Sequence, residues 1–283
     1  MTAQVAPSRR ALIVLGMHRS GTSALAGMLW RLGLDLGTNL MPPEEGSNSL
    51  GFYEHNSIVP AHEILLRAMG SHWSSAEPFP DGWLESRAAD EARGSIEQVL
   101  DHDFPPGRAV DWGMKDPRLC RFVRLWRRLL TGSEPCFILV RRDPREVAAS
   151  LAARDGMEPE DAAWLWWRYM SEAERDTRGA RRIFVDYDEL LGDWRKLVSK
   201  IAGAFAVPGL PAVALDPNGP GAAEVDRYLD PAERHHRGRA ATDGVPLPDT
   251  VAAFDAVFRD AIAGGGASAN LQFAALGHLE ARR

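Results

Sequence analysis

The chain has 283 residues, of which 45% are hydrophobic and 25% are charged, and its formal net charge at pH 7 is -6. This is an ordinary globular composition, so a disordered, collagen-like or coiled-coil chain is excluded. Because no block of basic residues stands out, we expect no nucleic-acid partner.

The first apolar run follows Arg9 and Arg10 and imitates the start of a signal peptide. His18 and Arg19 end the run too early, so we interpret residues 11–15 as a buried strand. No stretch approaches the roughly 20 apolar residues of a membrane span, and we expect no stable membrane insertion. Two cysteines are too few for a disulfide framework or a four-cysteine zinc site, which fits a cytoplasmic protein.

The spacing of apolar residues predicts strands that alternate with helices. We expect strands over residues 11–15, 137–140 and 183–185, and a turn over 16–23. Helices are expected over 24–34, 58–69 and 85–100, then from Asp143, then over 158–177, 188–205 and 250–263, and finally in a short C-terminal segment. This alternation is typical of a three-layer α/β fold, in which helices cover both faces of a mostly parallel sheet.

Two segments are rich in Pro, Gly and polar residues and are expected to form mainly loops. They span about residues 38–84, around the helix at 58–69, and about residues 208–248. We find no internal repeat and no convincing linker, so residues 1–283 are expected to form a single domain.

The first chemical motif is the turn at residues 16–23, which reads Gly-Met-His-Arg-Ser-Gly-Thr-Ser. It joins a predicted strand to the start of a helix, where backbone N–H groups and the helix dipole favour an anion. Arg19 adds a positive charge, and the serine and threonine residues add hydroxyl groups. A plain strand-to-helix turn is the alternative, but the run favours a phosphate or a similar oxyanion.

The turn differs from the P-loop of nucleoside triphosphatases, which reads Gly-x-x-x-x-Gly-Lys-Ser/Thr. Gly16 and Gly21 have the right spacing, but Thr22 occupies the lysine position. Asp186 is the nearest candidate for a magnesium-binding carboxylate at a strand end. The turn is therefore interpreted as a phosphate cradle of another kind.

The second motif, at residues 142–150, reads Arg-Asp-Pro-Arg-Glu-Val-Ala-Ala-Ser and follows the predicted strand at 137–140. Asp143 is suited to cap the helix, with Pro144 at its first position and Glu146 completing a capping-box-like pattern. Arg142 and Ser150 could grip a second anion. Taken by itself, this motif favours the alternative, in which Arg142 pairs with a nearby carboxylate and Ser150 packs on the sheet.

Together, the two motifs resemble a known family. Residues 19–22 resemble the 5′-phosphosulfate loop of sulfotransferases that use 3′-phosphoadenosine 5′-phosphosulfate (PAPS), and Arg142 with Ser150 resembles their 3′-phosphate site. Residues 115–117, Lys-Asp-Pro, resemble a segment of the tyrosylprotein sulfotransferase branch. The ordered series is similar to a broad bacterial sulfotransferase group over about residues 11–195.

This resemblance implies a fold like that of the P-loop nucleotide hydrolases and an enzyme that moves a sulfuryl group from PAPS to an acceptor hydroxyl by in-line displacement, without a metal. The acceptor would be a carbohydrate, a glycolipid, a secondary metabolite or a tyrosine. Arg19 would hold the leaving phosphate, and Lys115 would add a second cation near the transferred group. The residues implied to bind the nucleotide are His18, Arg19, Ser20, Gly21, Thr22, Ser23, Arg142, Ser150 and Arg234.

Related branches use a carboxylate or a histidine as the general base, and the carboxylate follows the first helix. We rank Glu54 first, because flanking aromatic residues would desolvate it and raise its pKa, then Glu45, then His55. Arg234 begins a basic cluster, Arg-His-His-Arg, which could close over the nucleotide or form a solvated loop. No third metal ligand is near the two histidines, so no metal site is expected.

Two other functions stay open at this stage. The first is a small-molecule kinase with a degenerate P-loop, against which Thr22 counts. The second is a nucleotide-binding regulator without catalysis, against which the presence of both Arg19 and Lys115 counts. The sequence leaves the acceptor and the oligomeric state undetermined.

Overall fold

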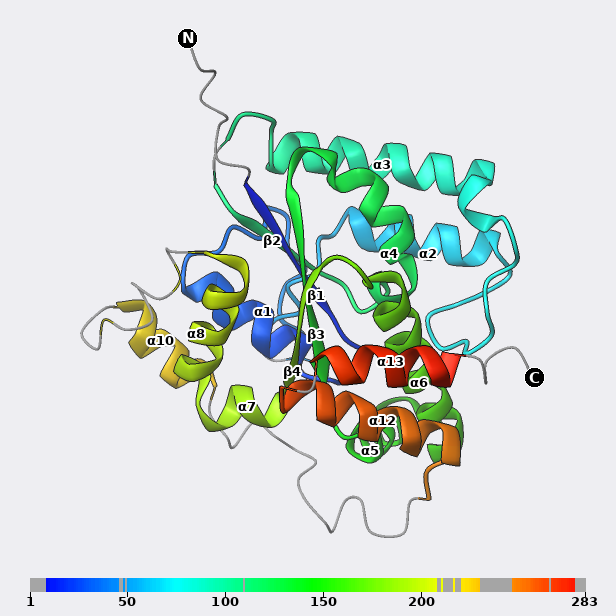
Figure 1. Ribbon diagram of the computed structural model, residues 1–283. Helices are drawn as coiled ribbons and strands as arrows, with labels where there is room; N and C mark the ends of the chain where they lie inside the picture. Colours follow the sequence, from blue (N-terminus) through cyan, green and yellow to red (C-terminus); the bar gives the residue numbers. More distant parts are fainter. Residues whose placement is uncertain are drawn as a thin grey trace.

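Four parallel strands form the central sheet of the computed structural model, which describes residues 9–45, 48, 50–108, 110–207, 210, 216, 220–229, 246–264 and 266–277 (Figure 1). The strands lie in the order β2-β1-β3-β4, and they are β1 (Arg10–Leu15), β2 (Trp112–Lys115), β3 (Glu134–Arg141) and β4 (Arg181–Asp186). Since the strands are parallel, their carboxyl ends share one edge, which is where open α/β sheets bind ligands.

The side chains of β1 explain why this strand lies inside the sheet. Leu12 and Val14 point into one hydrophobic core, and Ala11, Ile13 and Leu15 point into another on the opposite face. A strand that is buried on both faces reads as an unbroken aliphatic run rather than as an alternating one.

Helices cover both faces of the sheet, which confirms the predicted three-layer α/β architecture (Figure 1). On the Leu12 face lie α1 (Thr22–Arg31), α7 (Tyr187–Gly192), α8 (Trp194–Phe205) and α10 (Pro220–Tyr228). On the Ile13 face lie α2 (Ile58–Ala68), α3 (Arg87–Asp103), α4 (Leu119–Leu129), α5 (Pro144–Asp155), α6 (Pro159–Asp176), α12 (Asp249–Ile262) and α13 (Gly266–Gly277), with the short 3-10 helices η1 (Trp83–Glu85) and η2 (Leu130–Gly132).

The start of α5 follows its sequence signals in part. Asp143 accepts a hydrogen bond from the backbone N–H of Arg145, and Pro144 begins the helix, as predicted. The carboxylate of Glu146, which was expected to complete a capping-box-like pattern, accepts a hydrogen bond from Arg142, four residues earlier in the chain.

Several elements differ from the sequence predictions. Strand β2 and helix α4 were not predicted, although Leu119, Phe122, Val123 and Trp126 have helical spacing and are all buried. The single helix expected over 188–205 is two helices, because Asp193 ends α7 and caps α8 through the N–H of Lys196. Helix α10 lies inside the segment 208–248, which was expected to form mainly loops.

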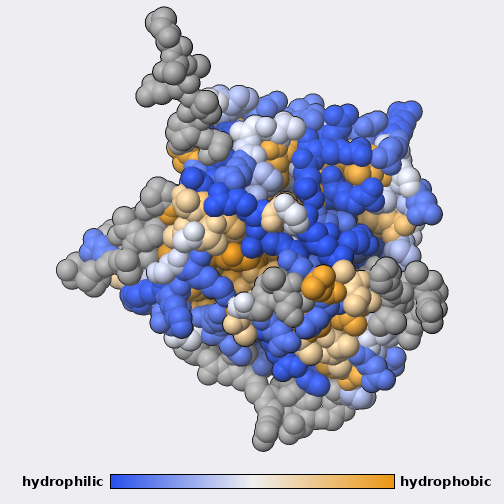
Figure 2. Space-filling view, in the orientation of Figure 1, coloured by the Kyte–Doolittle hydropathy of each residue, from blue (hydrophilic) through white to orange (hydrophobic). Residues whose placement is uncertain are grey.

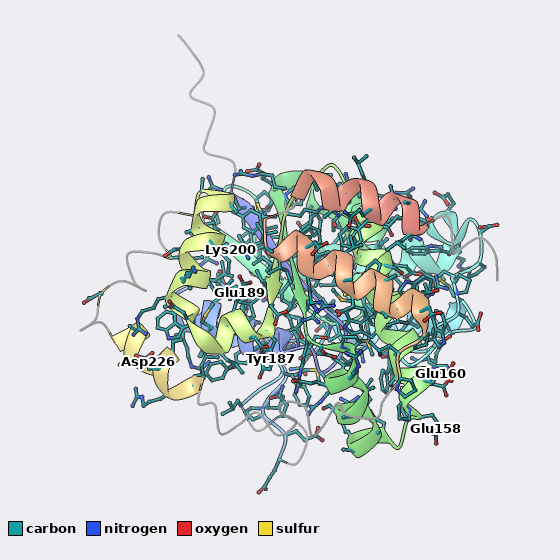
Figure 3. The ribbon with its side chains drawn as sticks, turned by 60° about the horizontal axis from the view of Figure 1, so that its bottom comes forward. Glu158, Glu160, Tyr187, Glu189, Lys200 and Asp226 are labelled. Atoms are coloured by element: carbon teal, nitrogen blue, oxygen red, sulfur yellow. The ribbon has the colours of Figure 1, made fainter. Side chains whose placement is uncertain are left out.

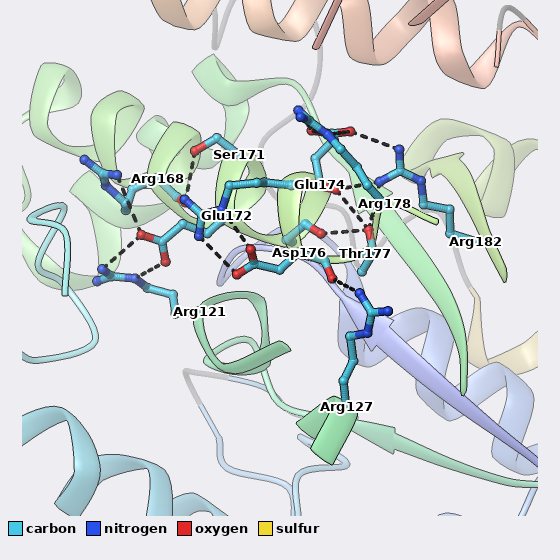
Figure 4. Close-up of polar contacts among 12 residues, drawn as sticks. Arg121, Arg127, Arg168, Ser171, Glu172, Glu174, Asp176, Thr177, Arg178 and Arg182 are labelled. Atoms are coloured by element: carbon cyan, nitrogen blue, oxygen red, sulfur yellow. Dashed lines mark hydrogen bonds and ion pairs between the residues drawn. The ribbon is translucent and has the colours of Figure 1, made fainter. Parts of the chain in front are cut away.

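The segment between α2 and η1 is held by side chains from two helices. Arg121 of α4 donates hydrogen bonds to the carbonyl oxygens of Ser75 (2.9 Å) and Glu77 (2.6 Å), and Arg168 of α6 donates to that of Ala76. Arg121 also pairs with Glu172 of α6 at 2.9 Å, within the polar network of Figure 4. These contacts fix an irregular stretch that has no regular backbone ladder of its own.

Hydrophilic side chains cover most of the described part of the face in Figure 2, and apolar ones gather in smaller groups. Within the described residues, no helix combines the length and apolar character needed to cross a bilayer.

Candidate active site

The loop after β1 turns sharply into α1 at the carboxyl edge of the sheet. Arg19 and Gly21 have positive φ angles of 68° and 84°, and Gly21 supplies no side chain to cap α1. A Cβ on Gly16 would lie 2.6 Å from the Cγ2 of Thr22 and 3.1 Å from the carbonyl oxygen of Val140, so no side chain fits there. An uncapped helix N-terminus in such a tight turn favours an anion.

Ser20 provides a direct test of whether this turn suits an anion. Its side chain is fully buried, and its Oγ has no hydrogen-bond partner among the described residues. Buried hydroxyl groups are normally paired, so an isolated one marks a place where a ligand oxygen fits. The turn is therefore suited to a phosphate or sulfate group.

Lys115 lies at the end of β2, beside the loop, because β2 pairs in register with β1. Its Nζ donates hydrogen bonds to the Oγ of Ser23 (2.8 Å), the carbonyl oxygen of Phe52 (2.9 Å) and the Oε1 of Glu54 (2.5 Å). Only 2% of Lys115 and 5% of Glu54 is exposed, so this is a buried ion pair at the edge of the loop.

The second oxygen of Glu54 is available for chemistry. Its Oε2 is buried and has no hydrogen-bond partner in the part of the chain that the structure describes. Burial raises the pKa of the Glu54 carboxyl above its ordinary value, and the nearby Lys115 ammonium opposes this shift. A carboxylate with a raised pKa and an unpaired oxygen is suited to accept a proton.

Arg142 and Ser150, from the second motif, both contact Arg19. Arg142 donates from Nη1 to the carbonyl oxygen of Arg19 and from Nε to Glu146, each at 2.9 Å. Arg19 in turn donates from Nε to the Oγ of Ser150 at 2.8 Å. Hydrogen bonds therefore join the two sequence motifs into one polar cluster at the sheet edge.

His18 lies on the other side of the loop, against aromatic rings. Its ring centroid is 4.9 Å from that of Trp73 and 5.9 Å from that of Tyr169. Its Nε2 is buried and has no hydrogen-bond partner among the described residues. Burial, and then the charge of Arg118, lowers the pKa of His18 well below its ordinary value, so the imidazole is neutral at pH 7.

Sequence reasoning missed a buried polar chain that begins at Asp116, the residue after Lys115. Asp116 accepts a hydrogen bond from the Nδ1 of His62 at 2.8 Å, and Trp126 donates to the other ring nitrogen of His62 at 2.9 Å. Although burial raises the pKa of Asp116, the Arg118 guanidinium and the His62 hydrogen bond hold it well below its ordinary value. The Lys-Asp-Pro series was noticed for its lysine, but His62 gave no signal, because its partner is distant in sequence.

Tyr187, the first residue of α7, lies close to the loop that follows β1 (Figure 3). Its ring lies so close to Gly21 that any side chain at Gly21 would overlap it. The guanidinium of Arg142 lies 5.2 Å from the centroid of the same ring. Tyr187 therefore borders the loop on the side of the second motif.

The structure brings most of the predicted site residues together but separates two candidate bases. His55 pairs through Nε2 with Asp103 at 3.1 Å and accepts the N–H of Ser57 at Nδ1, so both ring nitrogens are engaged away from Lys115. Glu45 is exposed in the loop that precedes Gly51. Arg234 and the basic cluster that it begins lie outside the described residues.

No protein-family model and no curated protein matches the sequence. Among solved structures, the chain is similar to the sulfotransferase domain of the Synechococcus PCC 7002 olefin synthase, with 18% identity, a TM-score of 0.45 and coverage of 97% of this chain and 95% of that one. It is also similar to a sulfotransferase from Mycobacterium tuberculosis, with 16% identity, a TM-score of 0.45 and coverage of 92% of this chain and 78% of that one. Similarity to the sulfotransferase domain of the curacin biosynthetic pathway is weaker, with 15% identity, a TM-score of 0.39 and coverage of 71% of this chain and 76% of that one. These low values assign the chain to no family, so the functional conclusion rests on the site.

Proposed function

We propose that this chain is a PAPS-dependent sulfotransferase that acts on an acceptor hydroxyl. The observation that carries the proposal is the position of the Lys115–Glu54 pair beside an anion-binding loop that has Thr22 where a P-loop has lysine. A lysine supplied by the neighbouring strand, and paired with a buried carboxylate, provides a cation and a base at one place.

The residues of the loop and of α5 fit the donor. Arg19 and the first N–H groups of α1 would hold the phosphosulfate, and the unpaired Ser20 hydroxyl supplies one further donor. Arg142 and Ser150, which already contact the loop, would hold the 3′-phosphate. When bound, PAPS supplies the sulfuryl group together with a phosphate leaving group.

Within this proposal, Glu54 accepts the proton of the acceptor hydroxyl at Oε2. Lys115 holds Oε1 of the same carboxylate at 2.5 Å and so fixes its direction. The positive charges of Lys115 and Arg19 would stabilise the negative charge that develops on the leaving phosphate. The acceptor is a carbohydrate, a glycolipid, a secondary metabolite or a tyrosine.

The two alternative functions fit the site less well. A kinase would need a carboxylate for magnesium, but Asp186 is already paired with Arg141 at 2.6 Å and accepts the N–H of Asp188. A regulator without catalysis has no use for the Lys115–Glu54 pair, since burying two charges costs several kcal/mol per ion before their attraction is counted.

Calorimetric titration with 3′-phosphoadenosine 5′-phosphate, with AMP and ATP–magnesium as comparisons, tests the proposal. We expect tight binding that requires the 3′-phosphate. The substitution Arg142→Ala should weaken it about 10- to 100-fold, which is the range for a lost hydrogen bond to a charged group. Glu54→Gln is the matched control, and it should keep nucleotide affinity while abolishing transfer. Equal affinity for ATP–magnesium would refute the proposal and favour a kinase.

A further inference from the structure

The residue before Glu54 has an unusual backbone conformation. Tyr53 has a φ angle of 62°, in the left-handed region that bulky residues avoid. Such a conformation persists only where the surroundings enforce it, and it is concentrated at functional sites. The contacts of Tyr53 therefore indicate what directs Glu54 toward Lys115.

A cationic side chain, Arg31, and an aromatic one, Tyr228, contact Tyr53. Arg31 donates from Nη1 to the Tyr53 hydroxyl at 2.7 Å, and this hydroxyl donates to the carbonyl oxygen of Leu50 at 3.0 Å. The Tyr228 ring meets Tyr53 edge-on, with centroids 6.2 Å apart, and the Arg31 guanidinium stacks 3.7 Å above Tyr228. Tyr228 thus closes the cluster that holds Tyr53.

Tyr228 also reaches the anion-binding loop directly. Its hydroxyl donates to the carbonyl oxygen of Ser23 at 2.9 Å, and Ser23 accepts a hydrogen bond from Lys115 through Oγ. One side chain therefore touches the neighbour of Glu54 and a hydrogen-bond partner of Lys115. Tyr228 is 6% exposed, so these contacts are made in a largely dry environment.

Helix α10 is positioned so that Tyr228 can make both contacts. Asp226, labelled in Figure 3, accepts hydrogen bonds from the Nε1 of Trp194 at 2.8 Å and from Arg195 at 2.7 Å, which ties α10 to α8. On α1, Gly27 leaves space for the tyrosines. A methyl group there would overlap the Tyr228 hydroxyl and lie 2.7 Å from the Cε2 of Tyr53.

We propose that Tyr228 is a positioning residue, through which the docking of α10 on α1 sets the geometry of Glu54 and Lys115. The sequence gives no hint of this, since Tyr228 lies in a segment expected to form loops. The role of the Glu54–Lys115 pair in sulfuryl transfer rests on the proposed function. The contacts themselves do not depend on which nucleotide binds.

Two variants test the proposal from opposite sides. Tyr228→Phe keeps the ring but removes the donor to Ser23, and Gly27→Ala pushes both tyrosines away from α1. Gly203→Ala on α8 is the matched control, because a methyl group there meets no atom within 4 Å. In each variant, ¹³C NMR follows the titration of the Glu54 side-chain carboxyl. The Glu54 signal is identified as the one that disappears in Glu54→Gln. Hydrogen exchange is measured for residues 22–25 and 52–55.

We expect the pKa of Glu54 to fall toward its ordinary value in Tyr228→Phe and further in Gly27→Ala, because water reaches the loosened carboxyl. Exchange at both segments should rise about five-fold on loss of one hydrogen bond. Gly203→Ala should match the wild type. Loss of thermal stability in Tyr228→Phe with an unchanged Glu54 titration would show mere packing and overturn the proposal. If Gly27→Ala does not fold, Tyr228→Phe alone decides.

The same samples separate this inference from the proposed function. Wild-type protein that fails to bind 3′-phosphoadenosine 5′-phosphate, but whose Glu54 titration responds to Tyr228→Phe, would refute the proposed donor and support the positioning role. Normal nucleotide binding with a Glu54 titration that ignores both variants would support the donor and overturn the positioning role.

Discussion

Individual side chains at the site carry charges and polar atoms that the folded chain has withdrawn from water. Lys115 and Glu54 are paired, whereas the Nε2 of His18 and the Oγ of Ser20 are buried with no partner among the described residues. Each unpaired polar atom costs about 1–3 kcal/mol of stability. Such a cost is expected where a ligand later provides the missing hydrogen bonds.

His18 gives a prediction about pH and stability. Its pKa is lowered in the folded protein, first by burial and then by Arg118, so the unfolded chain binds the proton more readily. The contribution of His18 is therefore complete above the ordinary histidine pKa of about 6.5, and it is lost as the pH falls below that value. We expect the free energy of unfolding to decline by up to about 1.4 kcal/mol per pH unit there.

Urea denaturation of the wild type and of His18→Gln between pH 7.5 and 5.5 measures this decline. The stability of the variant should change less with pH, so the two curves converge as the pH falls. Curves that stay parallel over the whole range would show that His18 keeps an ordinary pKa in the folded protein.

At the scale of elements, the strand–loop–helix unit of β1 and α1 depends on Gly16 and Gly21, since a side chain fits at neither position. Gly21 combines a positive φ angle with the close approach of Tyr187 from α7. Alanine at this position would meet the Tyr187 ring and would also pay the conformational cost of about 1–2 kcal/mol for a left-handed residue.

The substitution Gly21→Ala should therefore abolish measurable binding of 3′-phosphoadenosine 5′-phosphate while leaving the rest of the fold intact. Gly94→Ala, in the interior of α3 with no atom within 4 Å of its Cβ, is the control. It should keep nucleotide affinity and gain about 0.5–1 kcal/mol, because alanine favours a helix over glycine. Calorimetry and thermal denaturation measure the two effects, and nucleotide binding retained by Gly21→Ala would contradict the role of this turn.

At the scale of the whole molecule, buried ion pairs connect helices that the sequence separates widely. Arg121 of α4 pairs with Glu172 of α6, and it stacks 3.9 Å from the ring of Phe79. Because Arg121 also holds the carbonyl oxygens of Ser75 and Glu77, it links two helices to the segment beside His18. Removing Arg121 leaves the buried Glu172 carboxylate with the longer ion pair to Arg168, at 3.6 Å.

We expect Arg121→Met to lower the free energy of unfolding by about 3–5 kcal/mol. The double variant Arg121→Met with Glu172→Leu should recover part of this loss, since it removes the buried carboxylate that has lost its closer partner, although Arg168 then loses its ion pair with Glu172. Urea denaturation of the single and double variants measures the difference. An equal loss in both would show that the contacts to Ser75 and Glu77, rather than the ion pair, supply the stability.

The sequence alone determined the features that arise from local chemistry. Short aliphatic runs predict parallel strands, since a strand buried on both faces must be apolar throughout. The glycines and hydroxyl residues of the loop predict an anion site, because backbone conformation and N–H direction are local properties. Asp143 and Pro144 predict the start of α5 for the same reason. The predicted single helix over 188–205 is wrong, because Asp193 ends one helix and caps the next.

Only the tertiary structure decided which distant side chains meet. Glu54 and Lys115 are 61 positions apart, and Tyr228 lies 205 positions from Ser23. Apolar periodicity reports which face of an element is buried, but it does not report which polar group lies opposite. The sequence ranked Glu54 above His55 by its aromatic neighbours alone, whereas the fold pairs His55 with Asp103 and Glu54 with Lys115. Helix packing brings such groups together, and it is the sum of many weak contacts spread along the whole chain.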